Sequence, residues 1–134
     1  INLAKKRATS EKENYICGDV LDSELPARLD VIFTMESLYY FDDVARGVQY
    51  LASRLKAGGR LIFGCDFHKG NPQTAGWPHK LGVKMEYLSA DEWKQIFQDA
   101  GLTIEVSRFA RDPDNPEPWH REAMGTMIIV AAAL

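Results

Sequence analysis

Two short, unbroken apolar runs lie in the central part of the chain. The first, at residues 31–33, reads Val-Ile-Phe, and the second, at residues 61–63, reads Leu-Ile-Phe. Runs of β-branched, aliphatic and aromatic residues without polar alternation are typical of strands that are buried on both faces of a sheet. We therefore expect one strand over residues 30–35 and another over residues 61–67.

Between these runs the apolar residues recur at helical spacing. The members of this stripe are Val44, Val48, Leu51, Ala52 and Leu55, and such a spacing gives a helix one apolar face. Asp42 and Asp43 offer an N-cap before the stripe, and Gly58-Gly59 after it favours a helix end. Strand, helix and strand in succession predict a βαβ unit, and therefore two parallel strands with a helix packed across a face of the sheet.

Weaker patterns predict further elements on both sides of this unit. Residues 15–18 indicate a short strand, and residues 1–12 indicate the end of a helix. Ser89 begins a Ser-Ala-Asp-Glu capping box, which predicts a helix start. Residues 102–107 alternate apolar and polar side chains, as a half-exposed strand does, and residues 127–130 form another apolar run. Since no helical pattern separates the last two strands, we expect them to pair antiparallel.

Two long irregular stretches interrupt the pattern. Residues 68–88 contain two prolines, three glycines, Trp77 and two histidines, and residues 111–122 read RDPDNPEPWHRE. Long loops inside compact domains are often functional. We expect the first to be a structured loop or lid rather than a linker.

Composition and charge bound the class of protein. The chain has 134 residues and a formal net charge of −3, and we expect a single domain over residues 1–134. An acidic balance argues against nucleic acid and anionic membrane as partners, because both call for a basic surface. No apolar run approaches the length of about 20 residues that a membrane helix needs.

The two cysteines bear on the compartment. Cys17 and Cys65 both fall inside strands that we expect to be buried. We interpret them as small core thiols, which fits a reducing cytoplasm, and a disulfide between them is the alternative.

Five segments in order resemble the class I S-adenosylmethionine-dependent methyltransferase family, from about residue 3 to residue 130. They read LAKKRA, YICGDVLD, LDVIFTMESLYYF, LASRLKAGGRLIF and DAGL. The resemblance implies an α/β fold with a Rossmann-like methyltransferase sheet, mostly parallel, with an antiparallel C-terminal strand pair. It also implies S-adenosylmethionine as the cofactor.

Two of the family's cofactor motifs are missing from the sequence. They are the glycine-rich loop after the first strand and the acidic residue at the end of the second strand. The resemblance therefore implies a partial methyltransferase domain that lacks the first two of seven strands, as a truncated form or fragment of a longer enzyme. Without those strands the strand at residues 30–35 is left with an unpaired apolar edge. We expect one of three outcomes: more protein covers that edge, the sheet is rearranged, or two copies pair along the edge as a homodimer.

The resemblance also implies cofactor-binding residues. It places Asp19 at the adenine amino group, with the backbone N–H of Val20 at an adenine ring nitrogen. It places Thr34, Met35 and Glu36 beside the amino-acid end of the cofactor, at the carboxyl end of a strand where ligands of open α/β sheets bind. The alternatives are a solvated turn for Asp19 and a helix-capping acid for Glu36.

Candidate catalytic residues lie at the same edge of the expected sheet. Asp66 lies at the end of the strand at residues 61–67 and His68 comes directly after it, and with Glu36 they are candidates to orient or deprotonate an acceptor. Surface polar groups are the alternative. The three histidines, His68, His79 and His120, match no compact metal motif, and we expect no metal site.

Aromatic residues are candidates for the substrate site. Tyr39 and Tyr40 are expected to wall the cofactor or a substrate channel, and Trp77 and Trp119 lie in the long loops where the family places substrate-selecting residues. Packing in the core, or pinning of the loops, is the alternative for all four.

Three functions remain open from the sequence. The first is methyl transfer from S-adenosylmethionine to a small-molecule acceptor, provided that the N-terminal part is supplied. The second is a non-catalytic methyltransferase-like module for oligomerisation or partner binding, which the missing glycine loop favours. A nucleotide-dependent dehydrogenase is the third, and the antiparallel strand pair fits it poorly.

Overall fold

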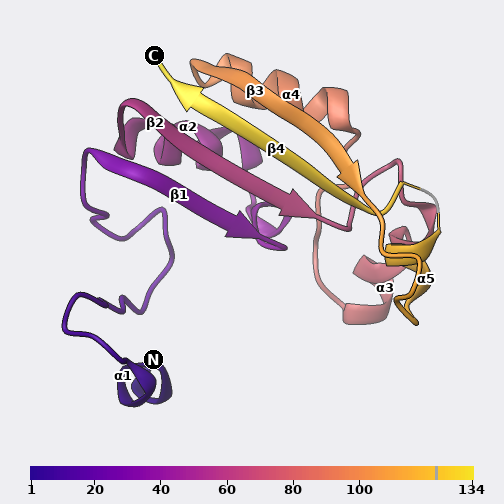
Figure 1. Cartoon of the computed structure of the whole chain (residues 1–134), viewed down its shortest axis with the longest axis horizontal. Coiled ribbons are helices and arrows are strands. Elements are labelled where there is room, and N and C mark those ends of the chain that lie inside the picture. Colours follow the sequence, from indigo (N-terminus) through magenta and orange to yellow (C-terminus); the bar gives the residue numbers. More distant parts are fainter. Residues whose placement is uncertain (123) are drawn as a thin grey trace.

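A four-stranded sheet forms the centre of the computed structural model, which describes residues 1–122 and 124–134. The strands are β1 (Leu29–Met35), β2 (Leu55–Cys65), β3 (Leu102–Ala110) and β4 (Thr126–Ala133), in the spatial order β1-β2-β4-β3. β1 and β2 are parallel, whereas β4 runs antiparallel to both β2 and β3 (Figure 1). The predicted α/β sheet, with its parallel βαβ unit and antiparallel C-terminal pair, is confirmed.

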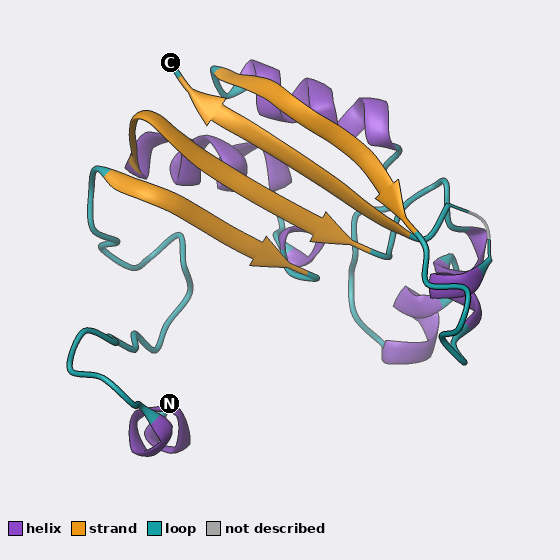
Figure 2. Cartoon of the chain, viewed as in Figure 1, coloured by secondary structure: helices purple, strands orange, loops and turns teal. Residues whose placement is uncertain are grey.

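Two of the helices cover one face of this sheet (Figure 2). The helices are α1 (Asn2–Arg7), α2 (Val44–Arg54), α3 (Trp77–Leu81), α4 (Ala90–Asp99) and α5 (Pro118–Arg121), with short 3₁₀ helices η1 (Leu38–Tyr40) and η2 (Pro72–Thr74). α2 and α4 contact each other, and Figure 1 shows both behind the strands. No helix of the described chain combines the length and the apolar character needed to cross a bilayer.

The hydrophobic core fills the space between the sheet and these two helices. Trp93 and Phe97 of α4 are fully buried, and the Trp93 ring lies 4.5 Å from the ring of Phe63 in β2. Val48 and Leu51 bring the apolar face of α2 into the same cluster. The helical spacing seen in the sequence therefore marks the faces that pack on the sheet.

The predicted helix starts are confirmed. The Asp43 carboxylate accepts a hydrogen bond from the Arg46 backbone N–H at 2.9 Å. The Ser89 hydroxyl accepts from the Glu92 N–H, and the Glu92 carboxylate accepts in turn from the Ser89 N–H. Both arrangements satisfy backbone donors that have no partner within a helix.

The predicted end of α2 is wrong. The helix ends at Arg54, and β2 begins at Leu55 and includes Gly58 and Gly59. A Cβ on Gly59 would lie 2.8 Å from the carbonyl oxygen of Leu29. This glycine is therefore required by the close approach of β1 to β2 rather than by the end of a helix.

The strand predicted at residues 15–18 does not form. This segment is irregular, and α1 with the residues after it extends away from the sheet (Figure 1). Among the described residues no strand lies beyond β1, so these backbone groups have no ladder to join. Cys17 is consequently exposed, which corrects the expected burial, whereas Cys65 in β2 is buried as expected.

The unpaired edge expected at the strand over residues 30–35 is present on β1. β1 lies at one end of the strand order and pairs with β2 on one side, and among the described residues no strand pairs with its other side. Its Val31 and Phe33 side chains are 51% and 68% exposed. The loop over residues 68–88 is structured, as predicted. Its ends are joined by a hydrogen bond from the Lys69 N–H to the Leu88 carbonyl, and the Glu86 N–H donates to the Tyr39 carbonyl.

Candidate functional site

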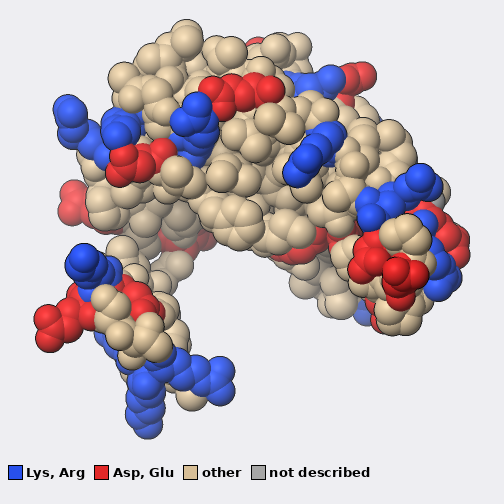
Figure 3. Space-filling model, in the orientation of Figure 1, with Lys and Arg blue, Asp and Glu red and all other residues tan. Residues whose placement is uncertain are grey.

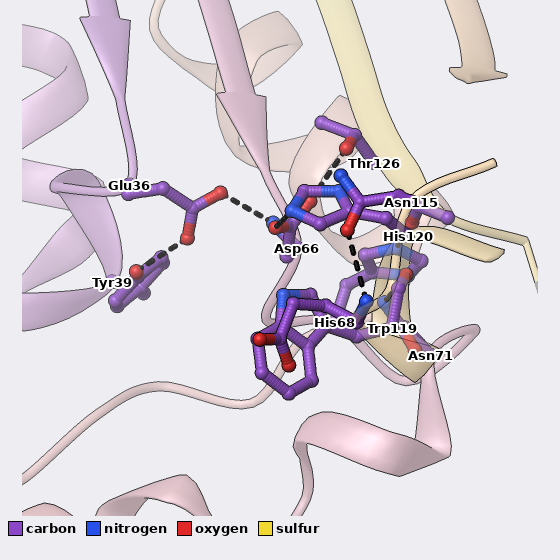
Figure 4. Close-up of polar contacts among 11 residues, drawn as sticks. Glu36, Tyr39, Asp66, His68, Asn71, Asn115, Trp119, His120 and Thr126 are labelled. Carbon is purple, nitrogen blue, oxygen red and sulfur yellow. Dashed lines mark hydrogen bonds and ion pairs between the residues drawn. The ribbon is translucent and has the colours of Figure 1, made fainter. Parts of the chain in front are cut away.

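The carboxyl ends of β1 and β2 are tied together by Glu36. This residue follows β1, and its carboxylate accepts from the Asp66 backbone N–H at 2.5 Å and from the Tyr39 hydroxyl at 2.6 Å (Figure 4). Its own N–H donates to the Gly64 carbonyl. Glu36 has a φ of 52°, in the left-handed region that non-glycine residues rarely adopt. Such backbone strain is found where surrounding contacts hold a functional site.

The protonation states at this junction follow from burial. Burial raises the pKa of Glu36, an effect that the Tyr39 hydrogen bond opposes and the nearby Asp66 carboxylate reinforces. Burial also raises the pKa of Tyr39, together with its hydrogen bond to Glu36. Tyr39 therefore stays a hydrogen-bond donor, and the two bonds that Glu36 accepts favour its ionised form against the cost of burial.

Asp66 lies next to Glu36, just past the end of β2. It is 5% exposed, and one carboxylate oxygen accepts from the Thr126 hydroxyl at 2.5 Å. The other oxygen lies 3.3 Å from Nε2 of His120 in α5 (Figure 4). Neither Thr126 nor His120 was predicted to act at the site. The side chain of His120 remains 31% exposed, so this pair links a buried carboxylate to solvent.

A cavity of about 370 Å³ opens beside these two carboxylates. It is lined by Glu36, Tyr39, Tyr40, Asp66, Trp77, Lys80, Leu81 and Trp119. All four aromatic residues predicted for the substrate site are in this wall, together with two of the three predicted catalytic residues. Lys80 and Leu81 of α3 were not predicted, because the helix they belong to lies inside a stretch with no apolar period.

The two tryptophans form perpendicular walls of this cavity. Their ring centroids lie 5.4 Å apart with an angle of 89° between the planes. Trp77 also stacks on the buried Phe67 at 6.2 Å. The Trp119 carbonyl accepts a hydrogen bond from the Asn71 side chain at 2.9 Å, and this bond holds α5 against the loop over residues 68–88.

His68 does not line the cavity. The sequence placed it at the rim of the sheet, but it is fully buried and packs against Phe109. Its Nε2 lies 2.7 Å from the Gly125 carbonyl, and Nδ1 accepts from the Gly70 N–H at 3.1 Å. These bonds require a neutral imidazole with its proton on Nε2, and they brace the loop after β2 against the start of β4.

The burial of His68 predicts an acid-sensitive fold. Burial lowers the pKa of His68, so the folded protein binds this proton less tightly than the unfolded chain. The stabilising contribution is fully present above pH 6.5, the ordinary value, and is lost as the pH falls below it. We expect the melting temperature, followed by circular dichroism from pH 7.5 to pH 5, to fall less steeply in the His68→Gln variant. Equal slopes in this variant, in the wild type and in a control at the exposed His79, His79→Gln, would contradict the assignment.

A second cavity, of about 560 Å³, follows the free edge of β1. Three of the residues predicted to bind cofactor, Val20, Thr34 and Met35, are in its wall. The Thr34 hydroxyl is 2.5 Å from the Ser37 hydroxyl, and the remainder of the lining is largely apolar. Asp19 lines neither of the two cavities. It is exposed, and its side chain accepts from the Leu21 N–H at 2.8 Å, as in a solvated turn.

The described residues contain no group of three or more His, Cys, Asp or Glu side chains arranged to hold a metal ion.

Comparisons with known proteins bear on the family. Residues 1–63 match the family described as "Methyltransferase domain". The chain is 30% identical over 120 residues to malonyl-[acyl-carrier protein] O-methyltransferase of Priestia megaterium, an alignment that covers 81% of this chain and 43% of that protein. The chain thus spans less than half the length of this curated relative.

Two solved structures share the fold. A chain from the complex between the Haloferax volcanii Trm112 methyltransferase activator and a methyltransferase has a TM-score of 0.89 and 22% identity, over 98% of this chain and 66% of that chain. An S-adenosylmethionine-dependent methyltransferase from Mesorhizobium loti has a TM-score of 0.72 and 18% identity, over 97% of this chain and 75% of that chain.

The sheet order and the cavities at the strand ends define an α/β protein of the Rossmann-like type. The similarities point to one family: residues 1–63 match a methyltransferase domain, and the chain shares its fold with S-adenosylmethionine-dependent methyltransferases, the family that its motifs resemble.

Proposed function

We propose that the protein containing this chain transfers a methyl group from S-adenosylmethionine to a small-molecule acceptor. The observation that carries this proposal is the cavity of about 370 Å³ at the carboxyl ends of β1 and β2, with Glu36 and Asp66 in its wall. Ligands of open α/β sheets bind at such strand ends, and pockets of about 300–1,000 Å³ suit small molecules.

The residues present fit part of the cofactor. The cavity along β1 has apolar walls that suit the flat face of an adenine ring. Val20 would contact the adenine, and Thr34 and Met35 would lie beside the amino-acid end of the cofactor. Glu36 would stand between this cavity and the acceptor site, and the role of Asp19 at the adenine remains a proposal. The described residues offer few hydrogen-bond partners for the ribose and amino-acid groups in this cavity. When bound, S-adenosylmethionine supplies a methyl group that is already activated.

The chain's own residues would align the acceptor and handle its proton. Asp66 is placed to accept a proton from the acceptor, with His120 behind it at 3.3 Å as a link to solvent. Glu36 and Tyr39 hold the two strand ends in register. The aromatic walls keep water away from the reacting groups. His68 supports the loop after β2 through its hydrogen bonds with Gly70 and Gly125.

Size and charge favour a small acceptor. On the face drawn in Figure 3, basic and acidic side chains are interspersed over the sheet, without a continuous basic area for a phosphate backbone. The net charge of −3 points the same way. We retain a reducing cytoplasm as the expected compartment.

A partner-binding module is the second candidate. It is favoured by the position of β1 at the end of the strand order, by its exposed apolar side chains, and by the structural neighbour that comes from a complex with an activator protein. Pairing of two copies along β1, which the sequence analysis raised, belongs to this proposal.

Methyl transfer tests the proposal directly. The complete gene product that contains this chain is incubated with S-adenosylmethionine labelled in its methyl group and with mixed small-molecule extracts. We expect label in the small-molecule fraction. Label that stays on the donor with a folded protein would contradict enzymatic function and favour the partner-binding candidate.

A further inference from the structure

The wall of the 370 Å³ cavity combines aromatic rings with negative charge. Trp77 and Trp119 stand perpendicular at 5.4 Å, and the rings of Tyr39 and Tyr40, which also line the cavity, lie tilted at 4.6 Å from each other. Aromatic faces attract cations through the ring quadrupole, and several rings around one site form a cage for alkylated ammonium groups.

The carboxylates define the sign of the charge that this cavity accepts. Glu36 and Asp66 both line it, whereas Lys80 is the one Lys or Arg among the described lining residues. The Lys80 side chain is exposed at the surface, where water screens its ammonium group. Asp66 is 5% exposed, so little water screens its carboxylate. Its attraction for a cation in the cavity is therefore stronger than that of a surface carboxylate.

An anionic acceptor fits this wall poorly. A carboxylate substrate would meet two carboxylates of the same sign and would need arginine or lysine side chains to pair with it. Of the lining residues that the structure describes, Lys80 alone could pair with such a group. A neutral acceptor would use the aromatic walls but would leave the charges of Glu36 and Asp66 without a function in binding.

We propose that the acceptor is an amine that binds as an ammonium ion between the aromatic walls and the carboxylates of this cavity. The proposal rests on the proposed methyl transfer and names its substrate class. Before transfer, the ammonium gives one proton to Asp66, which passes it through His120 to solvent. The amine lone pair then forms the bond to the methyl carbon, while the carbon–sulfur bond of the sulfonium donor breaks with its electron pair going to sulfur. The product is a more highly methylated amine.

The test uses three probes of equal shape and different charge, without any methyl donor. Choline carries a trimethylammonium group, 3,3-dimethylbutan-1-ol is its neutral counterpart, and 3,3-dimethylbutanoate is an anionic one. The complete gene product that contains this chain is titrated with each probe while its assigned indole N–H signals are followed by NMR. Trp77 and Trp119 report on the cavity, and Trp93, which is buried in the core, serves as an internal reference.

We expect choline to shift the Trp77 and Trp119 signals, to leave Trp93 unchanged, and to bind at least about tenfold more tightly than the neutral probe. Trp119→Leu and Tyr40→Leu should each weaken choline binding, and Trp119→Phe should retain most of it. Tyr15→Leu, which changes a tyrosine outside the cavity, should have no effect. Circular dichroism of each variant confirms that it is folded.

Equal binding of choline and the neutral probe, or tighter binding of the carboxylate, would overturn the inference. Methyl transfer by the complete gene product to a hydroxyl or carboxylate in preference to an amine would also overturn it, while the proposed function stands. Preferential binding of choline by a protein that transfers no methyl group would support the ammonium site and refute the proposed function alone.

Discussion

Replacement of Trp93 by alanine is expected to lower the free energy of unfolding by about 3–5 kcal/mol. The indole is fully buried between α4 and the sheet, 4.5 Å from Phe63 and 6.5 Å from Phe97. Alanine leaves a cavity that this packed cluster cannot close. Domains of this kind have a total stability of about 5–15 kcal/mol, so the variant would approach the unfolding limit. Urea unfolding followed by circular dichroism measures the change.

Trp93→Phe provides the matched control. The phenyl ring keeps contact with Phe63, and the substitution removes an indole N–H that has no hydrogen-bond partner among the described residues. We expect a loss of at most about 2 kcal/mol, because the smaller volume is offset by relief of the unsatisfied donor. A loss below about 1 kcal/mol for the alanine variant would show that α4 does not dock on the sheet as described.

Asp66→Asn is expected to lower kcat for methyl transfer by about 10²–10⁴-fold, the usual contribution of a general base. The asparagine carbonyl still accepts from the Thr126 hydroxyl, so the contact that closes this end of the sheet survives. The amide accepts no proton from the acceptor. The comparison is made on the complete gene product, with melting temperature and S-adenosylhomocysteine affinity measured alongside the rate.

The control for this variant is Asp114→Asn, an exposed carboxylate in the loop between β3 and α5. We expect it to leave the rate unchanged. A rate for Asp66→Asn within about twofold of the wild type would show that the acceptor's proton leaves by another route. An equal loss of cofactor affinity would instead indicate that Asp66 acts through structure.

The central part of the fold was predictable because each element carries its own signal. The apolar runs of β1 and β2, the stripe of α2 and the caps at Asp43 and Ser89 all depend on residues near in sequence. The alternation in β3 likewise marked an edge strand. Local patterns of this kind identify elements well, whatever packs against them later.

The errors arose where an element depends on a distant partner. A strand at residues 15–18 needs a neighbouring ladder, and none lies beside it among the described residues. Gly58-Gly59 resembles a helix end, but Gly59 serves the close contact with Leu29.

The site residues likewise divide into those marked by local sequence patterns and those that depend on distant contacts. Glu36 and Asp66 were predictable, because both follow apolar strands whose carboxyl ends meet. The sequence identifies His120 only as one of three histidines that match no metal motif. Its approach to Asp66 depends on how the proline-rich loop folds back over the end of β2, which no local period encodes. The burial of His68 was missed for the same reason, since its two partners, Gly70 and Gly125, lie on different loops.

Titration calorimetry with S-adenosylhomocysteine shows whether the carboxyl ends of β1 and β2 form the cofactor and acceptor site of a methyltransferase. The complete gene product that contains this chain is the sample, with Met35→Arg to block the cavity along β1 and Val106→Arg on β3 as the control. We expect saturable binding at one site, weakened by Met35→Arg and unchanged by Val106→Arg. No binding to a folded gene product, or equal binding by both variants, would contradict this assignment of the site.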